Sequence, residues 1–373
     1  MQKINVGILF GGRSAEHEVS LESARNVCEA IDREKFNPVL IGIDKSGRWF
    51  LGEDSRFLLG GGNLREIRLN EGGRPVTLVP GRGLAPVRAG EAGAIPPLDV
   101  VFPILHGPFG EDGTIQGLLK LADIPFVGSG VLGSALGMDK DVMKRLLRDA
   151  GIPVCKFLVL RSHGQLPPYG EVTEALGSPL FVKPANMGSS VGIAKVHDQG
   201  EYLPALTEAF RYDSKVIIEE CIRGRELECA VLGNEDVIAS APGEVIPRRE
   251  FYSYDAKYLD EHGAALIIPA ELDGALAERV RELAVKTFKT LCCEGLSRVD
   301  FFLRKREKEA GMPGDGSADL LVNEINTMPG FTRISMYPKL WEAGGISYTE
   351  LITRLIELAI DRFHSEQELA TSR

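Results

Sequence analysis

The sequence lacks the cysteine and histidine spacings on which zinc sites depend. Its six cysteines form no CxxC pair, and its six histidines form no HxH or HExxH pattern. Most of the cysteines lie in apolar surroundings, where a buried free thiol is the commoner state. The cysteines are Cys28, Cys155, Cys221, Cys229, Cys292 and Cys293. These absences argue against a zinc enzyme and against a nucleophilic-cysteine enzyme.

The sequence also lacks a basic run and a long apolar run. The formal net charge is -10 and the sequence pI is about 5.3, so we expect no surface that neutralises a nucleic-acid backbone. The longest apolar runs, such as residues 100–105, are far shorter than the ~20 residues of a membrane-spanning helix. No secretory signal precedes the first apolar run at Ile4. We therefore expect a cytoplasmic protein without nucleic-acid or membrane partners.

Two common nucleotide-binding motifs are missing as well. No GK[ST] follows a glycine loop, and no GxGxxG follows the first expected strand, so any nucleotide site must be of another kind. The composition is that of an ordinary globular protein, with 44% hydrophobic and 26% charged residues. A chain of 373 residues is too long for one ordinary core, which favours two or three domains.

Strand-like and helix-like segments alternate at the start of the chain. Residues 4–10 form an apolar run that ends in two glycines, and a helix is expected over residues 14–31. This order is typical of a parallel α/β domain, whose ligands collect at the carboxyl ends of the strands. The chain is therefore expected to be α/β.

Two stretches with weak periodicity interrupt this pattern. Residues 52–97 are rich in Gly, Pro and Arg and are interpreted as an insertion, and residues 304–319 are interpreted as a solvated hairpin loop. We expect three regions, comprising an N-terminal α/β domain over residues 1–130, a central region over residues 131–223 and a strand-rich C-terminal region over residues 224–373.

Polar side chains alternate with apolar ones in two strand-like runs of the C-terminal region. Alternate residues of a strand share a face, so Arg298 and Asp300 point one way, and so do Glu324 and Asn326. If the two strands are neighbours, one face gathers two carboxylates, an amide and a guanidinium, which is costly unless it binds a ligand. Oxygen ligands suit a hard cation, above all Mg²⁺ that carries nucleotide phosphates. The alternative is the wet face of an antiparallel sheet.

Two further segments could hold a nucleotide. Small residues over 188–192 allow backbone N–H groups to approach an anion, and Lys183 can add a positive charge. Residues 216–226 form an apolar strand followed by an acidic stretch, which suits adenine and ribose. The alternatives are an ordinary hairpin turn and a charged strand end.

Taken together and in order, these segments resemble the ATP-grasp ligases. Four longer motifs are similar to signatures of the D-alanine:D-alanine ligases, and the resemblance covers roughly residues 4–364. They are GGRSAEHEVS at 11–20, LHGPFGEDGT at 105–114, FYSYDAKY at 251–258 and NEINTMPG at 323–330. The resemblance implies an ATP-grasp fold after a Rossmann-like parallel-sheet domain. It also implies an ADP-forming ligase that joins two D-alanines through an acyl phosphate for peptidoglycan precursors, and a homodimer.

The resemblance also implies where ATP and metal bind. The implied phosphate-binding residues are Lys140, Lys183, Ser190 and Lys257, and those for adenine and ribose are Glu219, Glu220, Ile222 and Glu226. The implied ligands of two Mg²⁺ ions, with Mn²⁺ as an alternative, are Asp300, Glu324 and Asn326.

The same resemblance implies roles at the amino-acid site. Glu16 would bind the ammonium of the first D-alanine, with His106 near it, and Ser335 would bind the carboxylate of the second. The implied oxyanion donors are Arg298 and the Gly330 N–H. The implied trio of Glu16, Ser189 and Tyr258 would join the N-terminal domain to a lid over about residues 248–263.

Two other functions compete with this one. One is a depsipeptide ligase that uses D-lactate as acceptor, but Tyr258 belongs to the dipeptide-forming pattern. The other is a nucleotide-binding regulatory module without turnover, which would tolerate the loss of a metal ligand or of Arg298. None of these residues is missing from the sequence.

Overall fold

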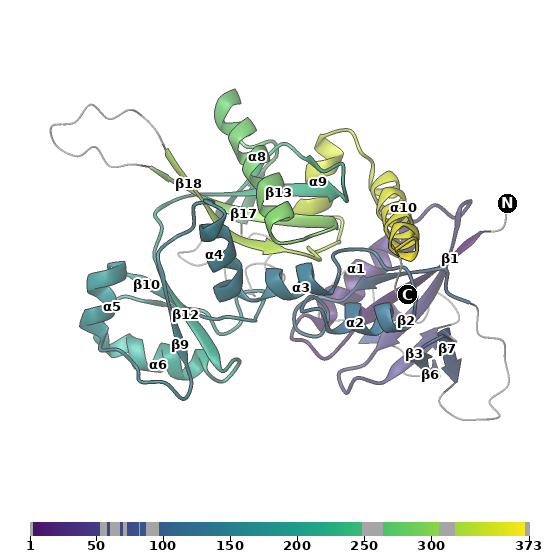
Figure 1. Ribbon diagram of the computed structural model, residues 1–373, viewed down its shortest axis with the longest axis horizontal. Helices are drawn as coiled ribbons and strands as arrows, with labels where there is room; N and C mark the ends of the chain where they lie inside the picture. Colours follow the sequence, from purple (N-terminus) through teal and green to yellow (C-terminus); the bar gives the residue numbers. More distant parts are fainter. Residues whose placement is uncertain are drawn as a thin grey trace.

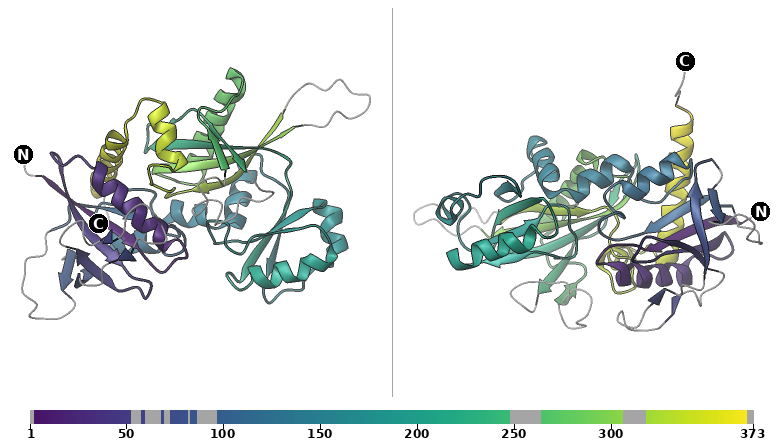
Figure 2. Two further views of the ribbon diagram at one scale, coloured as in Figure 1. Left: turned by 180° about the vertical axis from the view of Figure 1, so that it is seen from behind. Right: turned by 90° about the horizontal axis from the view of Figure 1, so that it is seen from below.

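The computed structural model describes residues 3–52, 58–59, 68–69, 73–81, 83–86, 97–247, 264–305 and 318–369. Three mixed α/β parts are built on three main sheets (Figure 1). The central four-stranded sheet and the N-terminal sheet form separate lobes, and the C-terminal sheet adjoins both (Figures 1 and 2). In these described residues, no helix is long and apolar enough to cross a membrane.

The N-terminal sheet combines a parallel half with an antiparallel half. Strands β1, β2 and β8 are parallel, whereas β3, β6 and β7 continue the sheet in antiparallel fashion. In sheet order the strands are β7 (Gly83–Pro86), β6 (Arg74–Val79), β3 (Trp49–Gly52), β2 (Phe36–Ile43), β1 (Ile4–Gly11) and β8 (Val100–Ile104). A separate pair is formed by β4 (Leu58–Leu59) and β5 (Arg68–Leu69).

The expected insertion over residues 52–97 was partly wrong. Its described segments include β6 and β7, which extend the N-terminal sheet. Val76 and Leu78 are buried at alternate positions of β6, and Leu84 of β7 is buried as well. Strands this short carry only one or two buried residues each, so their alternation was obscured by the surrounding Gly, Pro and Arg.

Helices cover both faces of the N-terminal sheet. One core contains side chains of β1 together with α1 (His17–Ala30) and α10 (Tyr348–Gln367). The core on the other face includes α2 (Thr114–Leu121). Helix α10 continues past the expected end near residue 363, and α9 (Met336–Ala343) precedes it.

The central sheet is antiparallel and has its own core. In order its strands are β11 (Ala194–Val196), β10 (Leu180–Pro184), β12 (Lys215–Glu220) and β9 (Phe157–Arg161). Apolar side chains on one face pack against α5 (Tyr169–Leu176) and α6 (Gln199–Ala209). The opposite face carries Lys183 and Glu219, because alternate residues point away from that core.

The C-terminal sheet lies between two cores. In order its strands are β16 (Ala264–Ile267), β15 (Gly243–Pro247), β13 (Gly224–Gly233), β17 (Gly295–Lys305) and β18 (Ala318–Asn326), and β14 (Ile238–Ala239) pairs with β13. One core contains α4 (Lys140–Asp149) and α8 (Gly274–Thr290). The core on the other face contains α9 and α10 and is shared with the N-terminal sheet. Helix α3 (Val131–Met138) precedes α4 and packs against it.

The expected loop over residues 304–319 is a strand at both ends. Strand β17 continues to Lys305 and β18 begins at Ala318, with Arg304 paired to Asp319. Residues 306–317 between them lie outside the described part of the chain.

Candidate active site

The two polar strands are neighbours, as the alternation predicted. Strands β17 and β18 are antiparallel, with Arg298 opposite Asn326 and Asp300 opposite Glu324. The register shifts directly after Asp300, and Asn323 has no partner on β17, which is the geometry of a β-bulge. The bulge places Glu324 and Asn326 on the polar face, although Val322 points into the core.

The guanidinium of Arg298 holds this face together. It binds both carboxylate oxygens of Asp300, with Nε–Oδ1 of 2.7 Å and Nη2–Oδ2 of 2.8 Å. Its Nε also lies 2.9 Å from Oε2 of Glu228 on β13, which is opposite Asp300. The Asn326 amide donates to Asp300 at 3.0 Å. The wet-face alternative does not fit these side chains, because those of Arg298, Glu228 and Asp300 are only 13–17% exposed.

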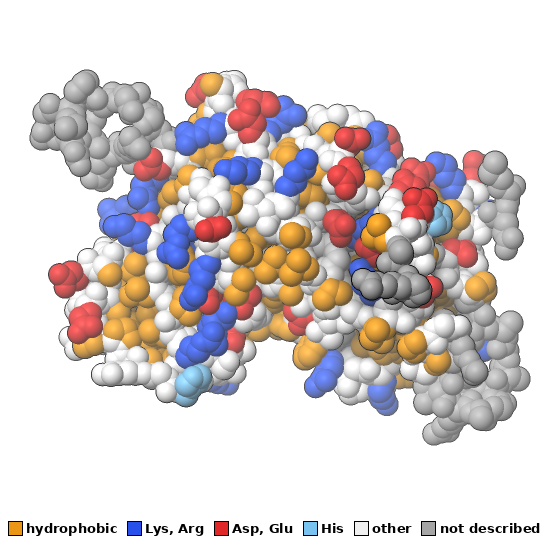
Figure 3. All heavy atoms as spheres, in the orientation of Figure 1, with side chains coloured by type: hydrophobic (Ala, Val, Ile, Leu, Met, Phe, Trp, Pro, Cys, Tyr) orange, Lys and Arg blue, Asp and Glu red, His pale blue; other side chains and the backbone are white. Residues whose placement is uncertain are grey.

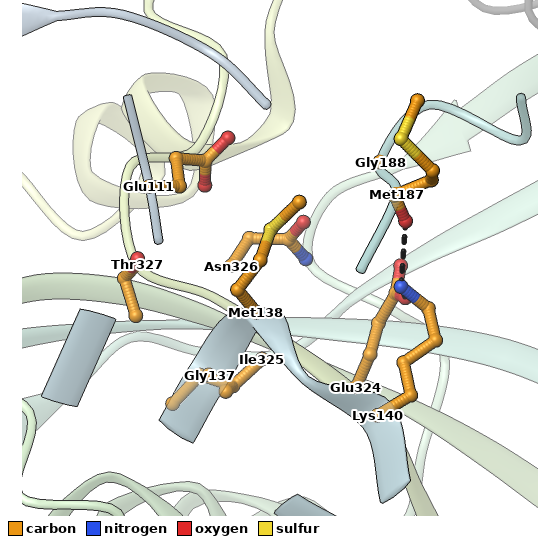
Figure 4. A pocket seen from close by; sticks show the side chains of 10 residues that line it. All are labelled: Glu111, Gly137, Met138, Lys140, Met187, Gly188, Glu324, Ile325, Asn326 and Thr327. Carbon is orange, nitrogen blue, oxygen red and sulfur yellow. Dashed lines mark hydrogen bonds and ion pairs between the residues drawn. The ribbon is translucent and has the colours of Figure 1, made fainter. Parts of the chain in front are cut away.

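A pocket lies beside this face and is shared by several parts of the chain (Figure 4). The Lys140 ammonium, at the first residue of α4, donates to the Met187 carbonyl at 2.7 Å and lies 3.6 Å from Glu324. Glu111 lies on the other side of the pocket, and Asn326 lies between it and the Lys140–Glu324 pair (Figure 4). The pocket lining comprises Glu111, Gly137, Met138, Lys140, Met187, Gly188, Glu324, Ile325, Asn326 and Thr327.

The Gly/Ser loop between β10 and β11 reaches the N-terminal domain. The Ser189 hydroxyl donates a hydrogen bond to Glu16, which directly precedes α1 and is buried. Ser189 and Ser190 have φ of 49° and 60°, in the left-handed region that few side chains adopt without support. This strained loop therefore joins two of the expected site residues across a domain boundary.

His106 is positioned by hydrogen bonds at both ring nitrogens. Burial lowers its pKa to about 4, so the ring is neutral at pH 7. Nδ1 lies 3.1 Å from the Met328 carbonyl and must donate to it, which leaves Nε2 to accept from the Ser23 hydroxyl at 3.1 Å. Ser23 in turn accepts from the Phe331 N–H at 3.3 Å. His106 thus fixes the turn after β18 against α1.

Glu111 is a site residue to which sequence reasoning assigned no role. Burial, together with the negative charge of Glu16, raises its pKa to about 8. Its two oxygens accept from the Gly107 N–H at 2.8 Å and the Met328 N–H at 3.2 Å. Glu111 lies in the motif at residues 105–114. It is far from Glu16 in sequence, so the motif alone did not indicate that the two carboxyls are neighbours.

A buried ion cluster lies on the nucleotide side of the site. Glu219 on β12 is 2.6 Å from the Lys183 ammonium and 3.0 Å from the Lys144 ammonium. Burial alone would raise the pKa of Glu219, but the two ammonium groups lower it to about 2. Sequence reasoning missed Lys144, although it lies one helical turn after Lys140 on the same face of α4.

The remaining expected residues are dispersed around this centre. The Glu220 carboxylate accepts from the Lys156 N–H at 2.8 Å and pairs with Arg304 at 2.9 Å, so it is directed to neighbouring strands. Ile222 and Glu226 are half-buried where the chain passes from the central to the C-terminal sheet.

The segment expected to bind the second amino acid lies beside His106. The Ser335 hydroxyl accepts from the Thr332 N–H at 3.1 Å, and a side chain at Gly330 would contact it. Lys257, Tyr258 and the expected lid lie outside the described residues.

The donor set at the polar face fits a divalent cation that brings phosphates with it. Within the described ranges, no three His, Cys, Asp or Glu side chains form a group able to hold a metal unaided. Two carboxylates and one amide are nevertheless the kind of partial oxygen shell that Mg²⁺ uses together with nucleotide phosphates. Asp300 and Glu324 are opposite each other, and Arg298 and Lys140 offset their charges.

Two antiparallel sheets that meet beside this pocket, with a mixed α/β domain before them, form the architecture of an ATP-grasp enzyme. Residues 5–129 match the family model "D-ala D-ala ligase N-terminus", and residues 146–357 match "D-ala D-ala ligase C-terminus". The chain belongs to the D-alanine–D-alanine ligase family.

Relatives cover the whole chain. The D-alanine–D-alanine ligase of Shouchella clausii is 51% identical over 100% of this chain and 99% of its own. The D-alanine–D-alanine ligase A of Escherichia coli K12 is 48% identical over 100% of both chains.

Solved structures agree with this assignment. The D-alanine-D-alanine ligase from Coxiella burnetii has a TM-score of 0.83 at 37% identity and covers 99% of this chain and 97% of its own. The VanG D-Ala:D-Ser ligase from Enterococcus faecalis has a TM-score of 0.79 at 35% identity and covers 96% of this chain and 100% of its own.

Proposed function

We propose that this pocket is the active site of an ATP-dependent ligase that joins two D-alanine molecules for peptidoglycan precursors. The observation that carries the proposal is the convergence of Lys140, Glu324, Asn326 and the Gly188 backbone on one pocket. These groups come from the start of α4, the end of β18 and the Gly/Ser loop, and they supply cationic, carboxylate, amide and backbone groups in one place. A transferred phosphoryl group requires this combination.

On the nucleotide side, the proposal assigns ATP to the face of the central sheet that carries Lys183 and Glu219. Lys140, Lys183 and Ser190 would contact the phosphates, and Glu219 with the 220–222 backbone and Glu226 would hold adenine and ribose. Lys183 is paired with Glu219 here, and its ammonium has further N–H donors for a phosphate. Lys257 is assigned to the phosphates by the sequence resemblance alone.

The polar face would hold the divalent cations. Asp300, Glu324 and Asn326 are the proposed ligands of two Mg²⁺ ions, for which Mn²⁺ could substitute. The bound cations would offset the negative charge of the phosphates. Asp300 must then share its oxygens between a cation and Arg298, and Glu228 remains as a second partner for the guanidinium.

On the amino-acid side, the neighbouring carboxyls of Glu16 and Glu111 suit the ammonium of the first D-alanine. An incoming positive charge favours ionised Glu111, so binding is expected to release its proton. Arg298 and the Gly330 N–H are assigned to the oxyanion of the tetrahedral intermediate. Ser335 is assigned to the carboxylate of the second D-alanine.

A closed site is needed because an acyl phosphate exposed to water hydrolyses. The Ser189–Glu16 hydrogen bond supports closure by the Gly/Ser loop. Tyr258 is assigned to the same hydrogen-bonded group from the sequence. The proposal also includes a cytoplasmic homodimer.

The second candidate is a ligase with a different acceptor. One similar structure is described as a D-Ala:D-Ser ligase, so acceptor choice differs among proteins of this fold. The sequence at Tyr258 favours D-alanine over D-lactate as acceptor.

Phosphate release from ATP tests the function. We expect release and dipeptide formation with D-alanine, and none with L-alanine, D-lactate or D-serine offered alone. Mixtures with D-alanine identify the acceptor by product analysis, and a dominant D-lactate or D-serine product would replace this proposal by the second. Glu324→Gln should abolish turnover with unchanged circular dichroism, because it removes a proposed metal-bridging charge. Near-normal turnover of that variant at saturating Mg²⁺ would refute the metal assignment.

A further inference from the structure

Lys144 is a fully buried lysine to which the proposed chemistry gives no task. Its side chain is 0% exposed, and its ammonium faces three acceptors. These are Glu219 Oε1 at 3.0 Å, the Asn323 carbonyl at 3.0 Å and Cys155 Sγ at 3.4 Å. The ammonium donates hydrogen bonds to the Asn323 carbonyl and to Cys155 Sγ, and it forms an ion pair with Glu219. Burying a charge this completely is costly, and packing alone would favour an apolar side chain.

The acceptors belong to different sheets. Glu219 lies on β12 of the central sheet, whereas Asn323 lies on β18 of the C-terminal sheet. Asn323 is also the extra residue of the β-bulge and directly precedes Glu324. Lys144 therefore connects the nucleotide side of the site to the backbone that orients Glu324 and Asn326.

We propose that Lys144 is a positioning residue that holds the bulge carbonyl of Asn323 and the Glu219 carboxylate at a fixed separation. It thereby keeps Glu324 and Asn326 aimed at the metal position. It also gives Glu219 a second cationic partner while Lys183 contacts the phosphates. This inference rests on the proposed function and adds a residue to it.

The charges around Lys144 agree with this role. Burial alone would lower the pKa of Lys144, but the Glu219 carboxylate raises it above its usual range, so the side chain stays charged. Burial likewise raises the pKa of Cys155, which leaves the thiol neutral. Without Lys144, Glu219 would depend on Lys183 alone for neutralisation, and the bulge carbonyl would lose its buried donor.

A purely structural ion pair makes a different prediction, and Lys144→Met tests it. The substitution removes the contacts with Glu219 and Asn323, so the bulge carbonyl loses its buried donor. Glu219 keeps Lys183 as its partner, so the remaining buried pair is balanced in charge.

The experiment measures Mn²⁺ affinity by electron paramagnetic resonance at saturating β,γ-imido-ATP, with melting temperature measured in parallel. We expect Mn²⁺ affinity to fall about tenfold or more in Lys144→Met. Unchanged Mn²⁺ affinity in this variant would overturn the proposal. Should Lys144→Met fail to fold, the same titration of Lys144→Gln, which also lacks the ammonium, decides.

Lys215→Met is the matched control. Lys215 is another buried lysine with two carboxylate partners, Asp139 at 2.5 Å and Asp141 at 3.3 Å, and both lie at the start of α4 rather than on the bulge. It should lose stability but keep its Mn²⁺ affinity, and an equal fall in affinity would overturn the role assigned to Lys144. Phosphate release by the wild type with D-alanine is measured separately. Its absence would refute the proposed function, whereas the Mn²⁺ titration still tests Lys144.

Discussion

At the scale of single residues, the site is organised by groups whose charge depends on burial. His106 is neutral and serves as a hydrogen-bonding link, and Glu219 stays ionised between two lysines. Glu111 differs because the negative charge of another carboxyl, that of Glu16, raises its pKa further. Two neighbouring acidic groups suit a cationic ligand.

Glu111 should make stability depend on pH in a recognisable direction. Its pKa is raised from 4.5 to about 8 in the folded protein, so the folded state binds the proton more tightly than the unfolded state. Stability contributed by this group is present at low pH and is lost as pH rises towards 8. Glu111→Gln should remove that loss, reducing the difference in unfolding free energy between pH 5 and pH 8 by on the order of 3 kcal/mol.

Urea unfolding of both proteins at pH 5, 6, 7 and 8 measures the effect. The quantity to compare is the slope of unfolding free energy against pH. The absolute free energy is less informative, because the amide also loses one of the two backbone hydrogen bonds at every pH. Glu278→Gln on the exposed face of α8 is the control and should keep the wild-type slope. Parallel curves for wild type and Glu111→Gln would contradict the assignment.

At the scale of elements, short irregularities aim the functional groups. The sequence predicted the shared face of Glu324 and Asn326 because both follow the bulge. It could not predict the bulge itself, since Leu320 and Val322 have the same parity as Glu324 and yet point into the core. Register depends on the partner strand and on the donor to the Asn323 carbonyl, and neither is encoded locally.

The Gly/Ser loop is a second irregular element, and Gly192 is its most constrained position. Its φ is 69°, and a Cβ there would lie 2.7 Å from the Tyr212 ring and 2.8 Å from Pro184. Gly192→Ala should therefore displace the loop and cost about 1–2 kcal/mol, with weaker ATP binding. ATP affinity by calorimetry and the unfolding midpoint are the measurements.

Gly117→Ala in α2 is the matched control for this substitution. No atom lies within 4 Å of a Cβ at Gly117, so alanine should be neutral or stabilise by up to about 1 kcal/mol. Wild-type ATP affinity in Gly192→Ala would show that the loop does not contact the nucleotide.

At the scale of the whole molecule, the three sheets are not equally coupled. The N-terminal sheet shares one core with α9, α10 and β13, whereas the central sheet has a core of its own. The surface is hollowed between the central lobe and the N-terminal lobe (Figure 3). The central lobe is therefore the part whose position ligands can change at the lowest packing cost.

The sequence predicted more of the chemistry than of this assembly. The order of motifs was sufficient for the ATP-grasp fold and the ligase family, because each motif is local. The expected boundaries at residues 130 and 223 remain predictions, since a shared core depends on contacts between distant segments. Lys144 and Glu228 were missed for the same reason, because their partners lie on other elements.

Arg362 near the end of α10 forms polar contacts that join the N-terminal and C-terminal sheets. Its guanidinium donates to the Phe126 carbonyl at 2.8 Å and the Gly128 carbonyl at 2.5 Å, where the chain leaves the N-terminal sheet. It also pairs with Glu294, just before β17, at 3.1 Å and is only 9% exposed. Arg362→Ala would leave the two buried carbonyls without their donor, so we expect a loss of about 2–4 kcal/mol.

Arg354 on the same helix provides the comparison. It forms an exposed ion pair with Glu350 one helical turn away, and such pairs contribute about 0.5 kcal/mol or less. Urea unfolding followed by tryptophan fluorescence reports on both sides of the junction, because Trp49 lies in the N-terminal sheet and Trp341 in α9. Arg362→Ala should lower the midpoint far more than Arg354→Ala. Equal shifts would mean that the shared apolar core alone joins the two sheets, and that the Arg362 contacts add nothing to it.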